Sequence, residues 1–295
     1  MAGAALLAAL CLGGHLLVPA GAGSSPPRAG ARDIASDLRV SLPLQAYQLT
    51  PREQADADQA LQLLVRSCME RAGFTWYVPA EPRPKPDPLA RRYGVVERRT
   101  AERYGYHPPA DKSSGEIARR RERILSEPGA DVAYFGSQGA KNADRNAGKN
   151  TGRGGAGCAS LAQRKLMAGA DGYRGDIGAQ LSWVSLEMSR KDPHVISARR
   201  DWEKCMRSRG YRYESPEKAI ADPAWHLDSP VVGSRERATA LADVTCKETV
   251  ATVRIWSRAE GAIQRRLIRE NAARLNETRR GLEAFRRTVR AVLGG

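Results

Sequence analysis

Residues 67–79 read SCMERAGFTWYVP, and residues 204–216 read KCMRSRGYRYESP. The two stretches share the pattern C-M-x(3)-G-[FY], followed by a second aromatic residue and a proline. In each, cysteine and methionine suit the buried face of a last helical turn. Gly73 and Gly210 suit the left-handed position just after a helix, and proline prevents the helix from continuing. The repeat therefore predicts two helices that end in the same way.

Both helices also have marked beginnings. Thr50 and Glu53 have the spacing of a capping box, with Pro51 at the first helical position. Asp192-Pro193 gives the second helix a similar start. Apolar residues then recur at helical spacing up to each cysteine, so two amphipathic helices are expected.

The N-terminus reads as an export signal. Residues 4–18, AALLAALCLGGHLLV, form an uncharged apolar run that is too short to span a membrane. Residues 20–22 read AGA and resemble a signal-peptidase site, which predicts a signal peptide over 1–22. No lysine or arginine precedes the run. Leu10 stands before Cys11 where a lipobox has glycine or alanine, so a lipid anchor is not expected.

Export makes the remaining cysteines an even set. Removing the signal peptide leaves Cys68, Cys158, Cys205 and Cys246, and an even number in an oxidising compartment predicts two disulfides. Four cysteines allow three connectivities. The simplest one staples helices within each unit, Cys68 to Cys158 and Cys205 to Cys246. None lies in a C-x-x-C motif.

These features predict an all-α fold of two disulfide-stapled helical units, irregular connections and a long C-terminal helix. The units extend over 45–170 and 178–260, within one helical body over 45–260. A flexible segment over 23–44 is expected before the body, and the basic end of the C-terminal helix follows it over 261–295.

The chain after Cys246 reads as one helix almost to Val292, because it contains no proline and keeps an approximate heptad. Its first apolar residues are expected to pack on the helix over 50–72 or the helix over 192–209; they are Val253, Trp256, Ile263 and Leu267. Its end is expected to project from the body, with an apolar stripe left partly exposed beside arginines. This predicted partner-binding surface consists of Arg279, Arg280, Leu282, Phe285, Arg286, Arg287 and Val289. Arginine runs also occur at 119–121 and 265–266, where a solvated helix face is the plain interpretation.

The repeated motif, the YGYHPP segment at 104–109 and the cysteine-bearing helices that follow resemble uncharacterised secreted, lipoprotein-like helical proteins of actinobacteria. The resemblance covers roughly residues 45–260. It implies an exported helical fold and brings no catalytic residues. Many of those relatives carry a lipid anchor, and this chain departs from them in lacking a good lipobox.

The charge is strongly positive. Forty-eight lysines and arginines stand against 33 acidic residues, a net charge of +15, and the mean hydropathy is −0.51. A soluble, self-repelling surface is the plain interpretation of this excess. The alternative is an anionic partner, and export favours a wall polymer or a membrane surface over nucleic acid.

The sequence marks no catalytic or metal site. The glycines at 152–157 match G-x-G-x-x-G, but a polar loop precedes them where a nucleotide site needs a strand. The mature histidines lack the spacing of zinc ligands, and no G-x-S-x-G occurs. We therefore expect no metal and no cofactor. His107 reads as a packed loop histidine, with a base or a ligand as the alternative.

Acidic residues near the aromatic segment leave an enzyme as the alternative, because a glycosidase needs only two carboxylates facing a cleft. The candidates are Glu97, Glu102, Asp111 and Glu116. The sequence favours an exported, non-catalytic cell-envelope protein that binds a partner protein or an anionic envelope polymer. The alternatives are an enzyme acting on cell-wall glycan and an accessory to an export or signalling system.

Overall fold

The computed structural model describes residues 41–81, 87–109, 112–137, 155–173 and 177–294. The signal peptide predicted over 1–22 lies outside these residues, as does most of the segment over 23–44. Within the described ranges the chain is helical, and the only extended pairing is an isolated bridge between Gly136 and Ala156. The predicted all-α class is confirmed.

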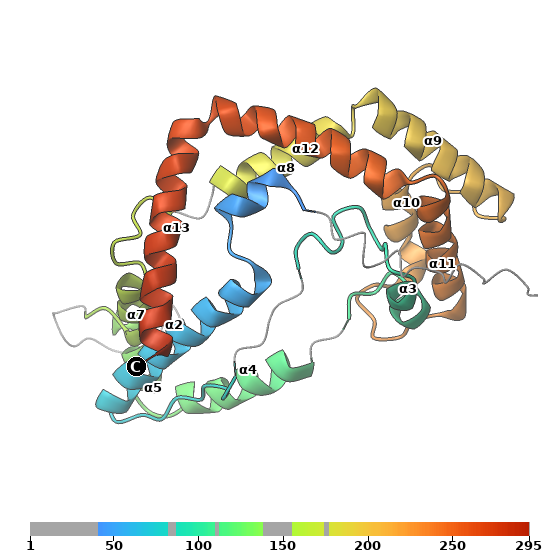
Figure 1. The fold of residues 1–295 in the computed structure, drawn as a ribbon. Coiled ribbons are helices and arrows are strands. Elements are labelled where there is room, and N and C mark those ends of the chain that lie inside the picture. The colour runs from blue at the N-terminus through green and yellow to red at the C-terminus, as the bar shows by residue number, and fades with distance from the viewer. Residues whose placement is uncertain (1–40, 82–86, 110–111, 138–154, 174–176, 295) are drawn as a thin grey trace, which may run out of the picture. The chain divides into compact units, whose positions relative to one another are not determined.

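The helices follow one another along the chain, and Figure 1 labels most of them. The two 3₁₀ helices are η1 (Pro43–Tyr47) and η2 (Pro223–Trp225). The first α-helices are α2 (Pro51–Arg71), α3 (Arg98–Tyr104), α4 (Lys112–Leu125), α5 (Ala130–Phe135) and α7 (Cys158–Leu166). The remaining α-helices are α8 (Ile177–Ser189), α9 (Pro193–Ser208), α10 (Pro216–Ile220), α11 (Ser234–Thr249), α12 (Thr252–Glu270) and α13 (Ala272–Leu293).

The repeated motif ends α2 and α9 with the same hydrogen bonds. The amide of Phe74 donates to the carbonyl of Met69 over 2.9 Å, and the amide of Tyr211 donates to that of Met206 over 3.0 Å. The glycine before each aromatic residue has a positive φ, +88° and +87°. Both methionine side chains are fully buried. The prediction of a left-handed glycine and a folded-back aromatic residue is confirmed in both copies.

The predicted helix starts are confirmed as well. The hydroxyl of Thr50 accepts from the amide of Glu53 over 3.2 Å, and the Glu53 carboxylate accepts from the amide of Thr50 over 2.8 Å. The carboxylate of Asp192 accepts from the amide of His194 over 2.8 Å. Side chains thus satisfy amides that the first turn of each helix leaves without a partner.

The two disulfides join the helices that the sequence paired. Cys68 bonds Cys158, which staples α2 to α7, and Cys205 bonds Cys246, which staples α9 to α11. The Cα–Cα distances are 5.5 and 5.7 Å. Of the three open connectivities, the one that staples each unit internally is confirmed.

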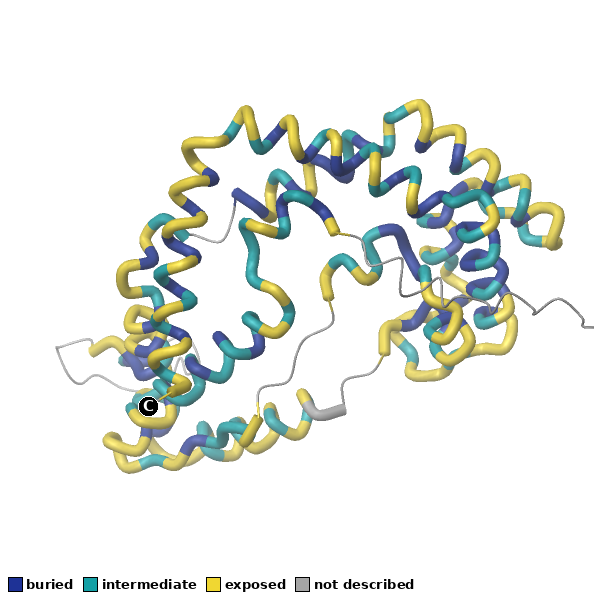
Figure 2. The backbone as a smooth tube through the Cα atoms, in the orientation of Figure 1, coloured by how far each residue is buried: buried dark blue, intermediate teal, exposed yellow. Residues whose placement is uncertain are grey.

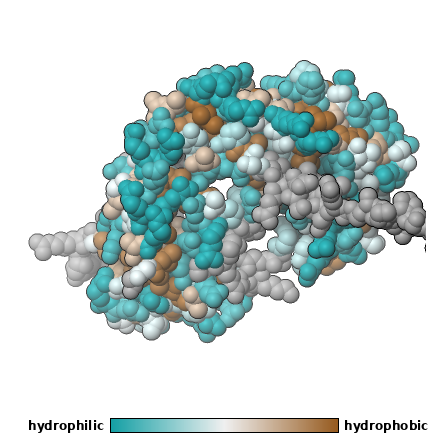
Figure 3. Space-filling model, viewed as in Figure 1, coloured by the Kyte–Doolittle hydropathy of each residue, from teal (hydrophilic) through white to brown (hydrophobic). Residues whose placement is uncertain are grey.

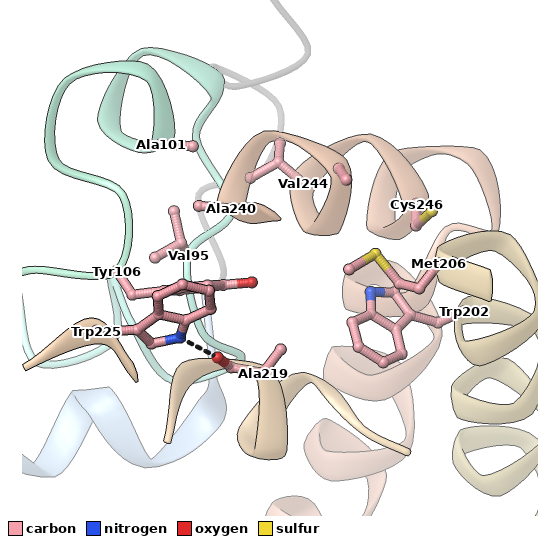
Figure 4. Packing of buried hydrophobic residues seen from close by; sticks show 11 residues of the cluster. Val95, Ala101, Tyr106, Trp202, Met206, Ala219, Trp225, Ala240, Val244 and Cys246 are labelled. Atoms are coloured by element: carbon pink, nitrogen blue, oxygen red, sulfur yellow. Dashed lines mark hydrogen bonds between the residues drawn. The ribbon is translucent and has the colours of Figure 1, made fainter. Parts of the chain in front are cut away.

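The core around the second disulfide is the richest in large side chains (Figure 4). Trp202 and Met206 of α9 pack with Cys246 of α11. Tyr106 belongs to the predicted first unit, in the segment before Cys158. Its ring lies beside that of Trp225, with ring centroids 5.8 Å apart. Helix α3 also packs on α11. The division into units over 45–170 and 178–260 did not predict this crossing.

The predicted long C-terminal helix is confirmed as α13, but the expectation of one unbroken helix from Cys246 is wrong, because α11, α12 and α13 divide this part of the chain. The first break is at Ala251, whose φ of +54° lies in the left-handed region. The second is at Asn271, whose side-chain amide donates to the carbonyl of Leu267 over 2.9 Å and closes α12. Neither break carries glycine or proline, so composition gave no signal. Figure 1 shows the chain turning sharply between α12 and α13.

The two final helices pack on different partners. Helix α12 lies against α8 and α9, and α13 lies against α2. Val253 and Trp256 of α12 share a cluster with Val195 of α9, as expected, but α8 was not foreseen as their neighbour. The end of the segment over 23–44 also belongs to the packed body, because Leu42 and Leu44 are buried.

Candidate functional site

A buried acid fixes the orientation of α12. The carboxylate of Glu260 is fully buried and accepts from the guanidinium Nε of Arg92 over 2.9 and 3.0 Å. The hydroxyl of Tyr93 donates to it over 2.7 Å, and that of Ser185 over 2.9 Å. A buried ion pair of this kind is held only when further hydrogen bonds satisfy its remaining lone pairs. The inward face of α12 is therefore polar and tightly specified.

Neighbouring polar groups extend this network. The side-chain amide of Gln264, one turn after Glu260, donates to the carboxylate over 2.9 Å, and its oxygen accepts from the amide of Leu44 over 2.9 Å. The indole of Trp256 donates to the hydroxyl of Ser189 over 2.7 Å. Burial, and then the charge of Glu260, raise the pKa of Tyr93 well above its usual value. Tyr93 therefore stays a neutral donor.

The segment over 91–107 is also tied to α11. The ammonium of Lys247 donates to the carbonyl of Val95 and to Asp243, each over 2.9 Å. The carboxylate of Glu236 accepts from the amide of Tyr106 over 2.7 Å. These contacts fix the position of Arg92, which in turn fixes α12.

His107 is a packed loop histidine, as the plain interpretation predicted. It is buried, and its Nδ1 lies 2.9 Å from the Glu236 carboxylate. Burial alone would lower the pKa of His107, but Glu236 and the carbonyls of His226 and Ser229 outweigh burial and raise it. The histidine thus satisfies a buried carboxylate of α11 through this contact and helps to hold the loop in place.

A hollow of about 470 Å³ lies beside this pair. Its acidic side chains are those of Asp228 and Glu236, and Glu236 is held by His107. The hollow is lined by Ala224, Trp225, His226, Asp228, Ser229, Val231, Gly233, Arg235 and Glu236. Its one buried acid is thus already engaged in the fold.

Three of the four acids that the sequence proposes for glycan hydrolysis are described by the structure, and these three line neither hollow. Glu97 accepts from the hydroxyl of Thr100 over 3.0 Å, and Glu116 pairs with Arg120 over 2.6 Å. Glu102 is exposed, and Asp111 lies outside the described residues. The three of these carboxylates that the structure describes are not brought together across either hollow.

The outward face of α12 carries a line of exposed arginines. Arg254, Arg258, Arg265 and Arg269 are exposed, and they form no ion pair with any residue in the described ranges. Steps of three and four residues place them on one face of the helix, with Gly261 in the middle. Figure 2 shows exposed and buried residues alternating along α12. The buried network on the opposite face leaves this stripe in solvent.

A second hollow, of about 360 Å³, lies at the centre of this stripe, where α12 passes the start of η1. It is lined by Ser41, Pro43, Ser257, Arg258, Gly261 and Arg265. None of the described residues that line it is acidic. Of these residues the sequence had drawn attention only to Arg265, within an arginine run. The spacing Arg258, Gly261, Arg265 is the signal that was available for the others.

The surface predicted on α13 is only partly exposed. Leu282, Phe285 and Val289 are 0%, 5% and 6% exposed, so the expected apolar stripe is wrong. Phe285 and Val289 pack in one cluster with Ala57 of α2 and Leu166 of α7. Part of the helix was expected to project because the sequence did not show that α13 turns back onto α2.

The arginines of α13 divide into two kinds. Arg286 pairs with Glu53 of α2 over 2.8 Å, and Arg279 donates to Asn276 over 3.1 Å. Arg280 and Arg287 are exposed and have no ionic partner within the described part of the chain. Figure 3 shows hydrophilic side chains over much of α12 and α13.

The arginine run on α4 is partly structural. Arg120 lies over the ring of Tyr77, and Arg121 lies over that of Trp76. Arg121 also donates to the carbonyl of Tyr77 over 3.2 Å. Two of the three consecutive arginines therefore serve packing, because guanidinium groups stack on aromatic faces.

Among the described residues, no group of three or more histidine, cysteine, aspartate or glutamate side chains is placed to hold a metal ion. No helix within the same ranges is long and apolar enough to cross a membrane. The two disulfides indicate an oxidising compartment. Comparison with protein-family models, with curated proteins and with solved structures finds no match to this chain.

Proposed function

We propose that the protein is an exported, non-catalytic protein of the cell envelope that binds an anionic envelope polymer through α12 and α13. One observation carries this proposal: exposed arginines on these helices that have no ion pair within the described residues. We call them the arginine set; its members are Arg254, Arg258, Arg265, Arg269, Arg274, Arg279, Arg280, Arg287 and Arg290.

Charge supports a polyanion as the partner. The exposed acids on the two helices are only Glu270, Glu277 and Glu283, and Glu270 already pairs with Arg266 over 3.7 Å. Positive groups gathered on one surface raise the local concentration of anions and speed their capture. Because the net charge of the whole chain is +15, the rest of the molecule does not cancel this attraction.

Export is supported by the disulfides and by the predicted signal peptide over 1–22. In the envelope, the anionic partners are wall polymers and lipid headgroups. The apolar side chains that a membrane-docking helix would need on α13 are buried against α2 and α7. The polymer is therefore the favoured partner, and the enzyme acting on glycan keeps no supporting pair of carboxylates among the described residues.

Binding to an isolated anionic wall polymer tests the proposal. The full mature chain should bind at low salt, and affinity should fall by at least about tenfold between roughly 0.05 and 0.5 M salt, because screening weakens exposed charges. Replacing Arg254, Arg258, Arg265 and Arg269 with glutamine should weaken binding strongly.

The matched control replaces four exposed arginines elsewhere that also have no ion pair within the described ranges: Arg99, Arg200, Arg209 and Arg212. Both variants lose four positive charges, so net charge alone would affect them equally. We expect the control to keep most of the affinity. Absence of binding by the unmodified protein at low salt would overturn the proposed function.

A further inference from the structure

The hollow over Gly261 is the most specific feature of the arginine set. It lies where Pro43, at the start of η1, passes the outward face of α12. Its volume of about 360 Å³ falls at the small end of the range for small-ligand sites, about 300–1,000 Å³. One or two units of a polyol phosphate chain would fit such a space.

The floor of the hollow exists because residue 261 has no side chain. Gly261 is buried, and a Cβ on it would stand 3.5 Å from Nη1 of Arg265 and 3.9 Å from Cδ of Pro43. The guanidinium of Arg265 therefore lies over the glycine. Glycine costs stability within a helix, and here it opens space between two cations.

The groups around the hollow are donors for an anion. Arg258 and Arg265 lie seven residues apart on one face, about 10 Å along the helix. Ser41 and Ser257 add hydroxyls. The hydroxyl of Ser257 donates to the carbonyl of Arg254 over 3.2 Å, a long hydrogen bond that a stronger acceptor can replace. The nearby acid, Glu260, is buried on the opposite face with Arg92.

We propose that this hollow binds a phosphodiester group of an anionic polyol phosphate polymer, an inference that rests on the proposed function. A phosphate directs its oxygens to several sides and can bridge two guanidinium groups, whereas a carboxylate presents one planar edge. The described lining residues include no aromatic ring on which a nucleic-acid base would stack. Among these same described residues there is also no large aliphatic side chain that would enter a lipid layer.

The surrounding arginines fit a linear polymer. Arg254 and Arg269 continue the line beyond both ends of the hollow, so that four arginines extend over about 22 Å of α12. A chain with regularly spaced phosphates can therefore meet the flanking arginines on either side of the central phosphate.

Calorimetric titration of the mature protein with a synthetic glycerol phosphate oligomer tests the proposal. Arg258→Gln with Arg265→Gln should reduce affinity by at least about tenfold. The matched control, Arg280→Gln with Arg287→Gln on α13, has the same spacing and charge loss, but Glu283 stands where α12 has Gly261. It should reduce affinity less than about threefold.

A second variant, Gly261→Leu, keeps every charge and fills the hollow. It should weaken oligomer binding as the arginine pair does, while circular dichroism and the melting temperature show that the helix is intact. Polyglutamate of matched charge should bind the unmodified protein more weakly, and its binding should be insensitive to Gly261→Leu.

The outcomes separate this inference from the proposed function. If the unmodified protein binds no polyanion, the proposed function fails. If it binds but the two arginine pairs lose affinity equally, or Gly261→Leu binds normally, the hollow is not the site and the general proposal stands. Tighter, Gly261-dependent binding to phosphatidylglycerol vesicles than to the oligomer would overturn the choice of a polymer.

Discussion

Helices α12 and α13 follow each other in the chain, have 19 and 22 residues and are both rich in arginine, yet opposite chemistry attaches them to the molecule. The inward face of α12 holds the buried carboxylate of Glu260 and the amide of Gln264. The inward face of α13 holds leucine, phenylalanine and valine side chains. One arginine of α13, Arg286, also forms an ion pair with Glu53 of α2.

The difference shows that arginine content does not identify a binding face. What matters is which arginines the inward contacts leave free, and what lies between them. On α12 a buried glycine separates Arg258 from Arg265, whereas on α13 an exposed glutamate separates Arg280 from Arg287. The same spacing therefore produces a cationic hollow on one helix and a locally balanced surface on the other.

The largest effect on stability is expected from a substitution that breaks the polar anchor of α12, the buried contacts of Glu260. Glu260→Gln leaves the guanidinium of Arg92 buried without its counter-charge, which should cost about 3–5 kcal/mol in the free energy of unfolding. Urea denaturation measures it. The counterpart on α13, Leu282→Ala, should cost about 2–5 kcal/mol through the cavity it leaves. If Glu260→Gln left the free energy of unfolding unchanged, this would show that α12 does not depend on this anchor.

The next largest effect on stability is expected at the glycines within the two helices, Gly261 and Gly281. A Cβ at Gly281 would stand 2.2 Å from the backbone nitrogen of Tyr173, so Gly281→Ala should destabilise by about 1–3 kcal/mol. Gly261→Ala meets only ordinary contacts and should stabilise by about 0.5–1 kcal/mol through helix propensity. Thermal unfolding of both variants measures the difference. If the two substitutions changed the stability in the same direction, this would contradict the packing described for the two helices.

The smallest effect concerns the ion pair of α13. Partial burial alone would raise the pKa of Glu53, but the hydrogen bonds and charge of Arg286, with the Thr50 contacts, lower it. A lowered pKa means that the pair stabilises the fold above about pH 4.5 and that this contribution is lost as pH falls through the folded pKa. Its size should be below about 1 kcal/mol, because both side chains are partly exposed.

Arg286→Gln provides the reference for this pH dependence, since the other carboxylates titrate in both proteins. The stability advantage of the unmodified protein over the variant should shrink between roughly pH 5 and pH 3. Denaturation at several pH values measures it. An advantage that grows as pH falls would contradict the assigned pair.

The parts of the fold that depend on local chemistry could be predicted from the sequence. The capping box at Thr50, the left-handed glycine of each motif and the pairing of cysteines within each unit follow from nearby residues or from the repeat. The breaks at Ala251 and Asn271 could not be predicted in this way. They bring α12 and α13 to separate partners, and the residues themselves carry no strong helix-stopping signal.

The candidate site was only partly predictable for the same reason. Glu260 and Arg92 are 168 residues apart, and no local pattern relates them. The sequence predicted a basic helical surface but placed it around Leu282, Phe285 and Val289. The heptad shows which residues form the apolar stripe of α13, but it does not show which other helix packs against that stripe. The hollow over Gly261 depends on how Pro43 packs, which only the tertiary structure shows.

Arginine-specific chemical modification with and without the glycerol phosphate oligomer tests the central claim most directly. Phenylglyoxal labelling of the mature protein, read by mass spectrometry, reports each arginine separately. We predict that the oligomer protects Arg258 and Arg265 most strongly, Arg254 and Arg269 partly, and Arg280 and Arg287 least. Protection of Arg280 and Arg287 with Arg258 and Arg265 still reactive would contradict the account.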